Sequence, residues 1–536
     1  MQRNGERLIE VGHLQQAVDR RTLLRRLAVG GVGSAVGSRW GLMSVRSASA
    51  QPRSLAEGTP GAGLAGEVTI DLASEPATLD PALAYDVDAW SVVHSVYDAL
   101  VQYGPDGRLE PLLAESLTLL DPLTYEIRLR QGVTFHNGEP LDARAVTFSV
   151  AHLVDPKVNS QVAENFKVIK RVEEVDALTV RLLLNQPAPW LPAQMAAWLV
   201  MLPPDYAADP AHDIGTQPVG TGPYRFVSWK RGAELALEVN PGYSKSSPKG
   251  RPMAERVSYR FVPEPSTRVS DLLAGTAGLI RSVPVDQRDA VASRGGEVIA
   301  EALSGSAWIR VPTDMAPFDD VRVRQALNYA VDIDGIVAAL LGGNGKRLAS
   351  FFVEGGMGYD ATLAPYPYDP DRARALLQEA GHGDGFATRL EYTGGERKDV
   401  VEAIVGQLGE VGVRVEAQAV EIATFNGAWA DPKAAPLRFA TWRPLFDPYT
   451  LLSLVVSKAG FLSRYQSAEA QPLIDAGAAE TDEAKRAETY RQLGRVLHDD
   501  PAAIYLYGLT ALYGIASDTP PWTPRRDDYI IPTVRG

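Results

Sequence analysis

The segment Thr124–Asp155 contains the stretch Leu129-Arg-Gln-Gly-Val-Thr-Phe-His-Asn-Gly-Glu-Pro140, and its pattern predicts a strand, a turn and a helix that follow one another closely. Apolar and charged residues alternate from Tyr125 to Leu129, which is typical of a strand with one buried face. His136-Asn-Gly138 is expected to form a turn, because asparagine and glycine accept the positive φ of a tight turn. Asp142 is then placed to cap the start of a helix.

Two later segments have sequence patterns that are equally clear. One is Pro218-Val-Gly-Thr-Gly-Pro-Tyr-Arg-Phe226, and the other runs Pro317-Phe-Asp-Asp-Val-Arg-Val-Arg-Gln-Ala326. The glycines of the first suggest a phosphate-binding loop, but such a loop ends in Gly-Lys-Ser/Thr, and Pro223 lacks the backbone donor that a phosphate would use. The second is predicted to be helical from Val321, because its apolar residues recur at helical spacing.

Together the three segments resemble family 5 of the extracellular solute-binding proteins, which deliver peptides, nickel chelates and similar solutes to ABC importers. The resemblance extends from about Val68 to Tyr507. It implies an α/β fold of the type II periplasmic binding protein kind, with two lobes and an extra small domain inserted in the first lobe. It also implies that the solute binds between the lobes, which close over it. His136 is expected to be structural, since a lone histidine seldom acts alone.

The first 66 residues are not expected to belong to the fold. Residues 1–50 are predicted to be a twin-arginine signal peptide, because Arg20-Arg21 precedes two leucines and a glycine-rich apolar run, and Ala48-Ser-Ala50 provides a cleavage pattern. The alternative is a basic amphipathic helix, which the glycines disfavour. Residues 51–66 are a linker rich in Pro, Gly and Ala. The predicted order after it is lobe I (67–99), the inserted small domain (100–190), lobe I again (191–310), lobe II (311–500) and a C-terminal part of lobe I (501–536).

Composition narrows the function classes. The chain has 536 residues, 45% of them hydrophobic and 22% charged, with a net charge of −13 and no cysteine. The negative net charge argues against a nucleic-acid partner. The lack of any cysteine excludes disulfides, thiolate metal sites and a cysteine-linked lipid anchor. No cofactor and no metal are expected, since no histidine pair has metal-ligand spacing. The expected partners are a small-molecule or peptide solute and the permease and ATPase of an ABC importer, with the chain acting as a periplasmic monomer.

Two other function classes remain as alternatives. A secreted hydrolase could use a pair of carboxylates, as glycosidases do, although the sequence contains no Gly-x-Ser-x-Gly elbow and no zinc motif. A periplasmic chaperone-like protein could hold unfolded segments in the same cleft. Thermal stabilisation by a ligand without turnover would distinguish a solute receptor from an enzyme.

Some candidate solute contacts come from position within the resemblance. The loop Glu75-Pro76-Ala77-Thr78 corresponds to a segment that lines the cleft in peptide-binding members, and a plain connecting loop is the alternative. Tyr392 and Arg397 belong to the region where dipeptide-binding members place an arginine for the carboxylate of the ligand, and a solvated arginine is the alternative there.

The class of ligand depends on the segment Phe439-Ala-Thr-Trp442-Arg-Pro-Leu-Phe-Asp-Pro448. Peptide-binding members carry a tryptophan, two residues and then an aspartate that pairs with the free amino terminus of the peptide. Leu445 takes the place of that aspartate here, and an unpaired buried ammonium costs on the order of 3–5 kcal/mol. Asp447, two residues further on, could assume the role through a local bulge.

Arg443 and Trp442 favour a different ligand. An arginine in a cleft suits a carboxylate or phosphate, and a tryptophan provides a flat wall for stacking. The alternatives are that Trp442 belongs to the core and that Arg443 points to solvent. The sequence therefore predicts a neutral or anionic small organic molecule, an amine-blocked peptide or a chelate.

Overall fold

The computed structural model describes residues 64–104, 107–244, 247–395, 397–429, 431, 433–442 and 447–535. The predicted signal peptide, most of the predicted linker, Arg443 and Leu445 lie outside these residues. Thr59–Gly536 forms one compact unit. None of its described helices is both long enough and apolar enough to cross a membrane.

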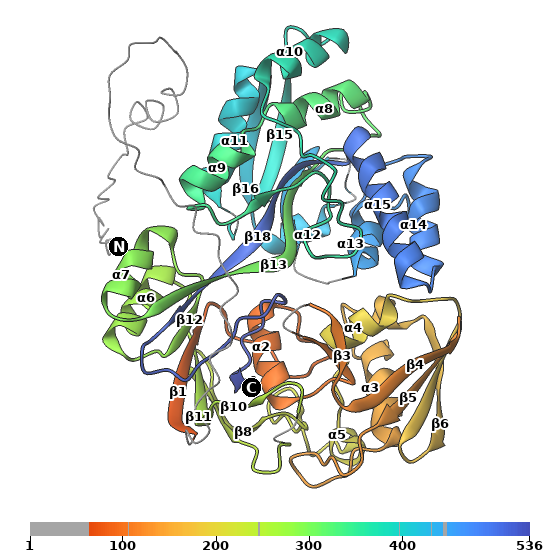
Figure 1. The fold of residues 1–536 in the computed structure, drawn as a ribbon, viewed down its shortest axis with the longest axis vertical. Helices are drawn as coiled ribbons and strands as arrows, with labels where there is room; N and C mark the ends of the chain where they lie inside the picture. The colour runs from red at the N-terminus through yellow and green to blue at the C-terminus, as the bar shows by residue number, and fades with distance from the viewer. Residues whose placement is uncertain are drawn as a thin grey trace, which may run out of the picture. The chain divides into compact units, whose positions relative to one another are not determined.

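A mixed eleven-stranded sheet runs through this unit in the order β16-β15-β17-β13-β18-β12-β1-β11-β9-β8, with β14 added at β18. Its centre is the antiparallel pair β13 (Glu297–Arg310) and β18 (Ala503–Ile515), which are 14 and 13 residues long. Figure 1 shows both strands passing from one half of the sheet to the other. Their register shifts between Ala302 and Ser306 and again between Ser306 and Trp308. Such irregularities bend a strand, so the sheet has two halves that meet at Ser304–Ser306.

The first half of the sheet belongs to the first lobe, which comprises residues 64–302 and 511–535. Its strands are β1 (Ala65–Leu72), β8 (Tyr224–Lys230), β9 (Glu234–Val239), β11 (Ala254–Phe261) and β12 (Leu279–Arg281), and its helices are α2 (Val87–Val96), α6 (Pro265–Ala274) and α7 (Arg288–Ser293), with a 3-10 turn at Val285–Gln287. The short strand β10 (Arg251–Pro252) pairs with β19 (Thr533–Val534), which returns the C-terminal end of the chain to this lobe.

A smaller antiparallel sheet lies within the first lobe. It consists of β4 (Ala114–Asp121), β5 (Thr124–Leu129), β7 (Thr179–Leu184) and β6 (Ile169–Asp176) in that order, next to the hairpin of β2 (Val101–Tyr103) and β3 (Leu109–Pro111). The accompanying helices are α3 (Ala143–Val154), α4 (Leu191–Trp198), α5 (Pro204–Ala208) and a 3-10 turn at Ala163–Phe166. We call this region the small sheet.

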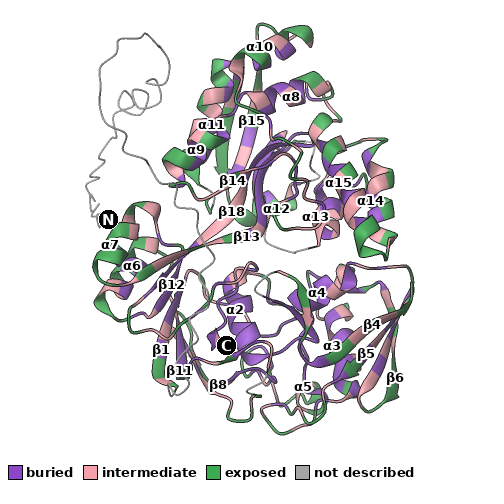
Figure 2. Cartoon of the chain, viewed as in Figure 1, coloured by how far each residue is buried: buried purple, intermediate pink, exposed green. Residues whose placement is uncertain are grey.

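The second lobe comprises residues 306–510. Its strands are β14 (Lys346–Arg347), β15 (Phe386–Thr393), β16 (Val413–Val420) and β17 (Leu437–Trp442), and its helices are α8 (Val321–Tyr329), α9 (Ile333–Leu340), α10 (Pro370–Glu379), α11 (Lys398–Glu410), α12 (Ile422–Gly427), α13 (Pro448–Val455), α14 (Ala470–Ala479) and α15 (Glu483–Asp499). In Figure 2, α14 and α15 each carry an exposed face, whereas α2 of the first lobe is almost wholly buried.

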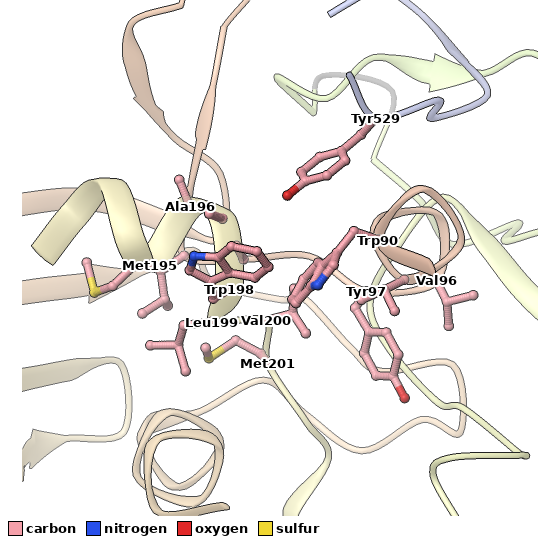
Figure 3. Close-up of a cluster of buried hydrophobic side chains, with 14 of the residues drawn as sticks. Trp90, Val96, Tyr97, Met195, Ala196, Trp198, Leu199, Val200, Met201 and Tyr529 are labelled. Carbon is pink, nitrogen blue, oxygen red and sulfur yellow. The ribbon is translucent and has the colours of Figure 1, made fainter. Parts of the chain in front are cut away.

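Aromatic side chains from distant segments form the core of the first lobe around α2 (Figure 3). The ring of Trp90 meets that of Trp198 edge-on at 5.2 Å between centroids, and Tyr529 of the C-terminal tail stacks on Trp90 at 6.4 Å. The tail is fixed by a hydrogen bond from the Ile530 amide to Ser91 Oγ at 2.9 Å. The first lobe is thus completed by the last residues of the chain.

Two of the sequence motifs contact each other through His136. Its Nε2 lies 3.0 Å from the carbonyl oxygen of Gly222, and its Nδ1 accepts from the Gly220 amide at 3.3 Å. An Nδ1 that accepts carries no proton, so the ring is the neutral Nε2–H tautomer. Burial lowers the pKa of His136 to about 4, which matches that neutral state. The histidine therefore has the structural role that the sequence predicts.

The ends of two elements depend on contacts with distant segments. Helix α2 stops at Val96, because the carbonyl of Val96 accepts from the Gly222 amide at 2.8 Å instead of continuing the helical ladder. Strand β18 continues to Ile515, because its second half pairs with both β13 and β12.

Candidate solute-binding site

A small cavity of about 50 Å³ lies at the break in the central sheet. Its walls are Ser304–Ser306 of β13, the loop residues Phe351–Val353, Gly356 and Met357, Trp442 at the end of β17, and Asp447, Pro448, Leu451 and Leu452 at the start of α13. We call it the Trp442 pocket. The strand pairing sets Trp442 opposite Ser306, so the pocket is built where the two halves of the sheet meet. Asp447 is the only charged residue among the described residues that line it.

The carboxylate of Asp447 is fully engaged. It caps α13 by accepting from the Tyr449 amide at 2.9 Å. Its Oδ2 and Oδ1 also accept from Nη1 and Nη2 of Arg486 at 2.5 and 2.8 Å. The side chains of Asp447 and Arg486 are only 8% and 3% exposed. This is a bidentate ion pair out of contact with bulk water, which is the strong form of this interaction.

Arg486 is held on every side by α15 and its neighbours. Its Nε donates to the Gly477 carbonyl at 2.6 Å, and its Nη2 donates to the hydroxyl of Tyr490 at 3.1 Å. Burial alone would lower the pKa of Arg486, but the Asp447 carboxylate outweighs burial and the pKa is raised. The guanidinium therefore stays charged, and the Asp447 oxygens stay neutralised by it.

Helix α13 also contacts the first lobe on the side of the small sheet. Nε2 of Gln194 in α4 donates to Oγ1 of Thr450 in α13 at 2.8 Å, and both side chains are buried. Next to this bond the rings of Trp190 and Tyr449 stack with centroids 4.6 Å apart and planes 19° apart. One helix thus lines the Trp442 pocket and joins the two lobes.

A second contact between the lobes borders the pocket on the side of the C-terminal tail. Nη2 of Arg526 donates to the carbonyl of Glu354 at 2.8 Å, and the Arg526 carbonyl accepts from the Ser304 amide at 3.2 Å. The loop of the second lobe that carries Phe351 and Phe352 is therefore tied to the first lobe. Both contacts between the lobes therefore involve segments that also line the Trp442 pocket, namely α13 and Ser304.

The loop Glu75–Thr78 makes its described contacts elsewhere. The Glu75 carboxylate accepts from Trp229 Nε1 at 3.0 Å and from the Gly232 amide at 2.9 Å. The carbonyls of Pro76 and Ala77 accept from Arg231 Nη1 at 3.0 and 3.2 Å, and Thr78 Oγ1 accepts from the Asp80 amide at 3.1 Å. The structure thus fastens this loop to the turn between β8 and β9, and none of the four residues lines the Trp442 pocket.

Tyr392 and Arg397 also lie away from the pocket. Tyr392 belongs to the core of the second lobe on β15. Arg397 precedes α11, where its Nη2 donates to the Leu340 carbonyl at 2.9 Å and its Nε donates to Asp399 at 2.9 Å. Of the described candidates, only Trp442 and Asp447 are brought together at one site.

The sequence reasoning missed the pocket residues contributed by β13 and by the loop after β14. Ser304-Gly305-Ser306 places three small residues in a row in the middle of β13, and glycine inside a strand often marks a close approach of a ligand or another backbone. That signal could have pointed to this part of β13. Phe351 and Phe352 look like ordinary core residues in the sequence, and only the fold places them in the pocket wall.

A two-lobed α/β fold with a pocket at the break in the sheet that joins the lobes is typical of a binding protein of the type II periplasmic kind. Comparison with known proteins identifies its family. The sequence model of the bacterial extracellular solute-binding proteins, family 5 Middle, matches residues 108–463. The chain belongs to this family, whose members are the solute-binding components of ABC importers.

The similar proteins agree with that assignment. The chain is 32% identical to the glutathione-binding protein GsiB of Pectobacterium atrosepticum over 66% of its own length and 69% of that protein. It is 29% identical to the probable D,D-dipeptide-binding periplasmic protein DdpA of Escherichia coli, over 82% and 88% of the two chains. The structure of the binding protein AgaA of A. tumefaciens R10 in complex with agropinic acid superposes with a TM-score of 0.71 at 26% identity, over 84% of this chain and 93% of that one. The chain is therefore a solute-binding component of an ABC importer, and its family consists of binding proteins.

Proposed function

We propose that the chain captures a solute that lacks a free amino group, namely a neutral or anionic small organic molecule, an amine-blocked peptide or a chelate. The single observation that supports this is the ion pair of Asp447 with Arg486. A ligand ammonium at this place would have to displace a bidentate guanidinium from a buried carboxylate. The exchange would leave Arg486 buried and unpaired, which is strongly unfavourable.

The site that we propose consists of Trp442, the neighbouring Arg443 and the first turn of α13. Trp442 and the apolar residues Met357, Leu451 and Leu452 provide the surface for a nonpolar group. Arg443 would provide the charge for a carboxylate or phosphate. The agropinic acid bound to AgaA supports an acidic solute, whereas the names of GsiB and DdpA favour a peptide as the second candidate.

Calorimetry with matched ligands separates the two candidates. We expect N-acetylated di- to pentapeptides or organic acids to bind the purified protein more tightly than the same peptides with free amino ends. Arg443→Ala should weaken the binding of the acidic ligands. The proposal would be overturned by micromolar binding of unblocked peptides that is lost on acetylation and in Asp447→Ala but is kept in Arg443→Ala.

We propose further that the chain works as a monomer in the periplasm, after export in the folded state by the twin-arginine route and cleavage near Ala50. Support comes from Arg20-Arg21 and from the lack of a cysteine for lipid attachment. Replacing both arginines with lysine should trap the precursor in the cytoplasm. Unchanged export of that variant would count against the proposed route.

A further inference from the structure

Phe352 lines two cavities. One is the Trp442 pocket. The other, of about 230 Å³, lies under β14 and the N-terminal part of the loop that follows it, and it is lined by Lys346–Ser350, Phe352, Gly358–Ala361, Leu363–Pro365 and Gly494. Among the described residues, Phe352 is the only one that lines both. This shared position makes its ring the candidate partition between the pocket and the second cavity.

The ring of Phe352 is fixed by close backbone approaches on both of its edges. A Cβ at Gly358 would lie 2.8 Å from Cε1 of the ring, and a Cβ at Gly494 would lie 3.2 Å from Cδ2. Gly358 also has a φ of +84°, which favours glycine. Tyr490 packs on the ring with centroids 6.1 Å apart. Phe352 itself is 7% exposed, so it cannot swing aside without moving its neighbours.

The pocket on one side of this partition has a mixed lining. Phe351, Met357 and Leu451 contribute apolar surface. Two buried polar atoms of lining residues, Trp442 Nε1 and Ser304 Oγ, have no hydrogen-bond partner among the described residues. An indole N–H can only donate, and a hydroxyl can donate as well. A group that reached these two donors would have to carry an oxygen acceptor, such as a carboxylate or an acyl carbonyl, beside its apolar part.

We propose that Phe352 determines the specificity of the Trp442 pocket by closing its inner end, so that the pocket admits a short apolar group attached to a carboxylate or carbonyl and excludes a longer one. This inference rests on the proposed function, because it assumes that the Trp442 pocket receives part of the solute. We therefore expect removal of the ring to join the pocket to the second cavity, which Phe352 also lines, and to create room for a longer group.

A graded series of aromatic acids tests the length limit. The probes are benzoate, phenylacetate, 3-phenylpropionate, 4-phenylbutyrate and 5-phenylvalerate, with affinities measured by ligand-observed NMR. For the unaltered protein we expect affinity to fall after the shortest members. For Phe352→Ala we expect it to rise with each methylene by up to about fourfold, which is the usual gain for burying one such group.

Two further variants keep the result interpretable. Phe351→Ala removes an identical ring from the same pocket, but Phe351 does not line the second cavity, so it should weaken all members alike and leave the length preference unchanged. Phe352→Leu retains part of the partition and should give an intermediate profile if the alanine variant folds poorly.

The inference is overturned if Phe352→Ala and Phe352→Leu keep the length profile of the unaltered protein, or if Phe351→Ala shifts the profile as Phe352→Ala does. It is also overturned if no member of the series binds any of the proteins. That last result would not touch the proposed function, because the peptide calorimetry tests it with ligands that need not enter the pocket by an aromatic group.

Discussion

Arg486→Met is the sharpest perturbation of the proposed site. Methionine fills a similar volume but removes the positive charge, so the Asp447 carboxylate would remain 8% exposed with no cation beside it. The change also removes the hydrogen bonds from the guanidinium to Gly477 and Tyr490. Breaking one partner of a buried ion pair costs about 3–5 kcal/mol of the free energy of unfolding.

The same helix supplies a matched control. Arg491 of α15 pairs with Glu488 at 2.8 Å, but those side chains are 36% and 45% exposed. Exposed ion pairs contribute about 0–1 kcal/mol, so Arg491→Met should change stability by no more than that. Replacing both members of the buried pair in Asp447→Leu/Arg486→Met should recover most of the loss, because no unpaired charge is left.

Urea unfolding followed by tryptophan fluorescence measures these differences directly. We expect Arg486→Met to unfold at a much lower urea concentration than Arg491→Met, with the double variant in between or better. Equal losses in Arg486→Met and Arg491→Met would show that Arg486 does not hold the Asp447 carboxylate as described, and that carboxylate would then be free to receive the amino group of a ligand.

Three further outcomes follow from other parts of the molecule. Burial lowers the pKa of His136 to about 4, so between pH 6.5 and 4 the unfolded chain binds a proton that the folded chain does not. As the pH is lowered through this range, the free energy of unfolding should decrease by up to about 1.4 kcal/mol per pH unit. Urea titration should show a smaller decrease in His136→Gln. Gln194→Ala removes a hydrogen bond between the lobes worth about 1 kcal/mol, so spin labels on two cysteines introduced into this cysteine-free chain should report a larger open fraction. Gly477→Ala, whose Cβ would lie 2.4 Å from a tyrosine ring atom, should lower the melting temperature, whereas Gly406→Ala, with no atom within 4 Å, should raise it.

Local patterns in the sequence predicted local structure well. Asp142 caps α3 by accepting from the Arg144 amide at 3.0 Å, and Gly138 has the positive φ of 92° that the turn requires. Helix α8 starts at Val321 as predicted. In each case the residues that determine the element lie within a few positions of one another, so the sequence alone carries the information.

Features that depend on contacts between distant parts of the chain could not be predicted from the sequence. Helix α2 ends at Val96 because the Val96 carbonyl accepts a hydrogen bond from the amide of Gly222, which lies more than a hundred residues later in the chain. Resemblance led to Trp442 and Asp447, but it could not show that Arg486 occupies the carboxylate, because an ion pair between α13 and α15 exists only once those helices pack. Phe352 was missed for the same reason.

The most direct test of the proposed ligand class is native mass spectrometry of the freshly purified protein, with the released solute then treated with an amine-acetylating reagent. We expect a bound solute whose mass is unchanged by the reagent, because the Asp447 carboxylate is already paired with Arg486 and cannot receive an ammonium. A released peptide that gains an acetyl group at its amino end would contradict the account.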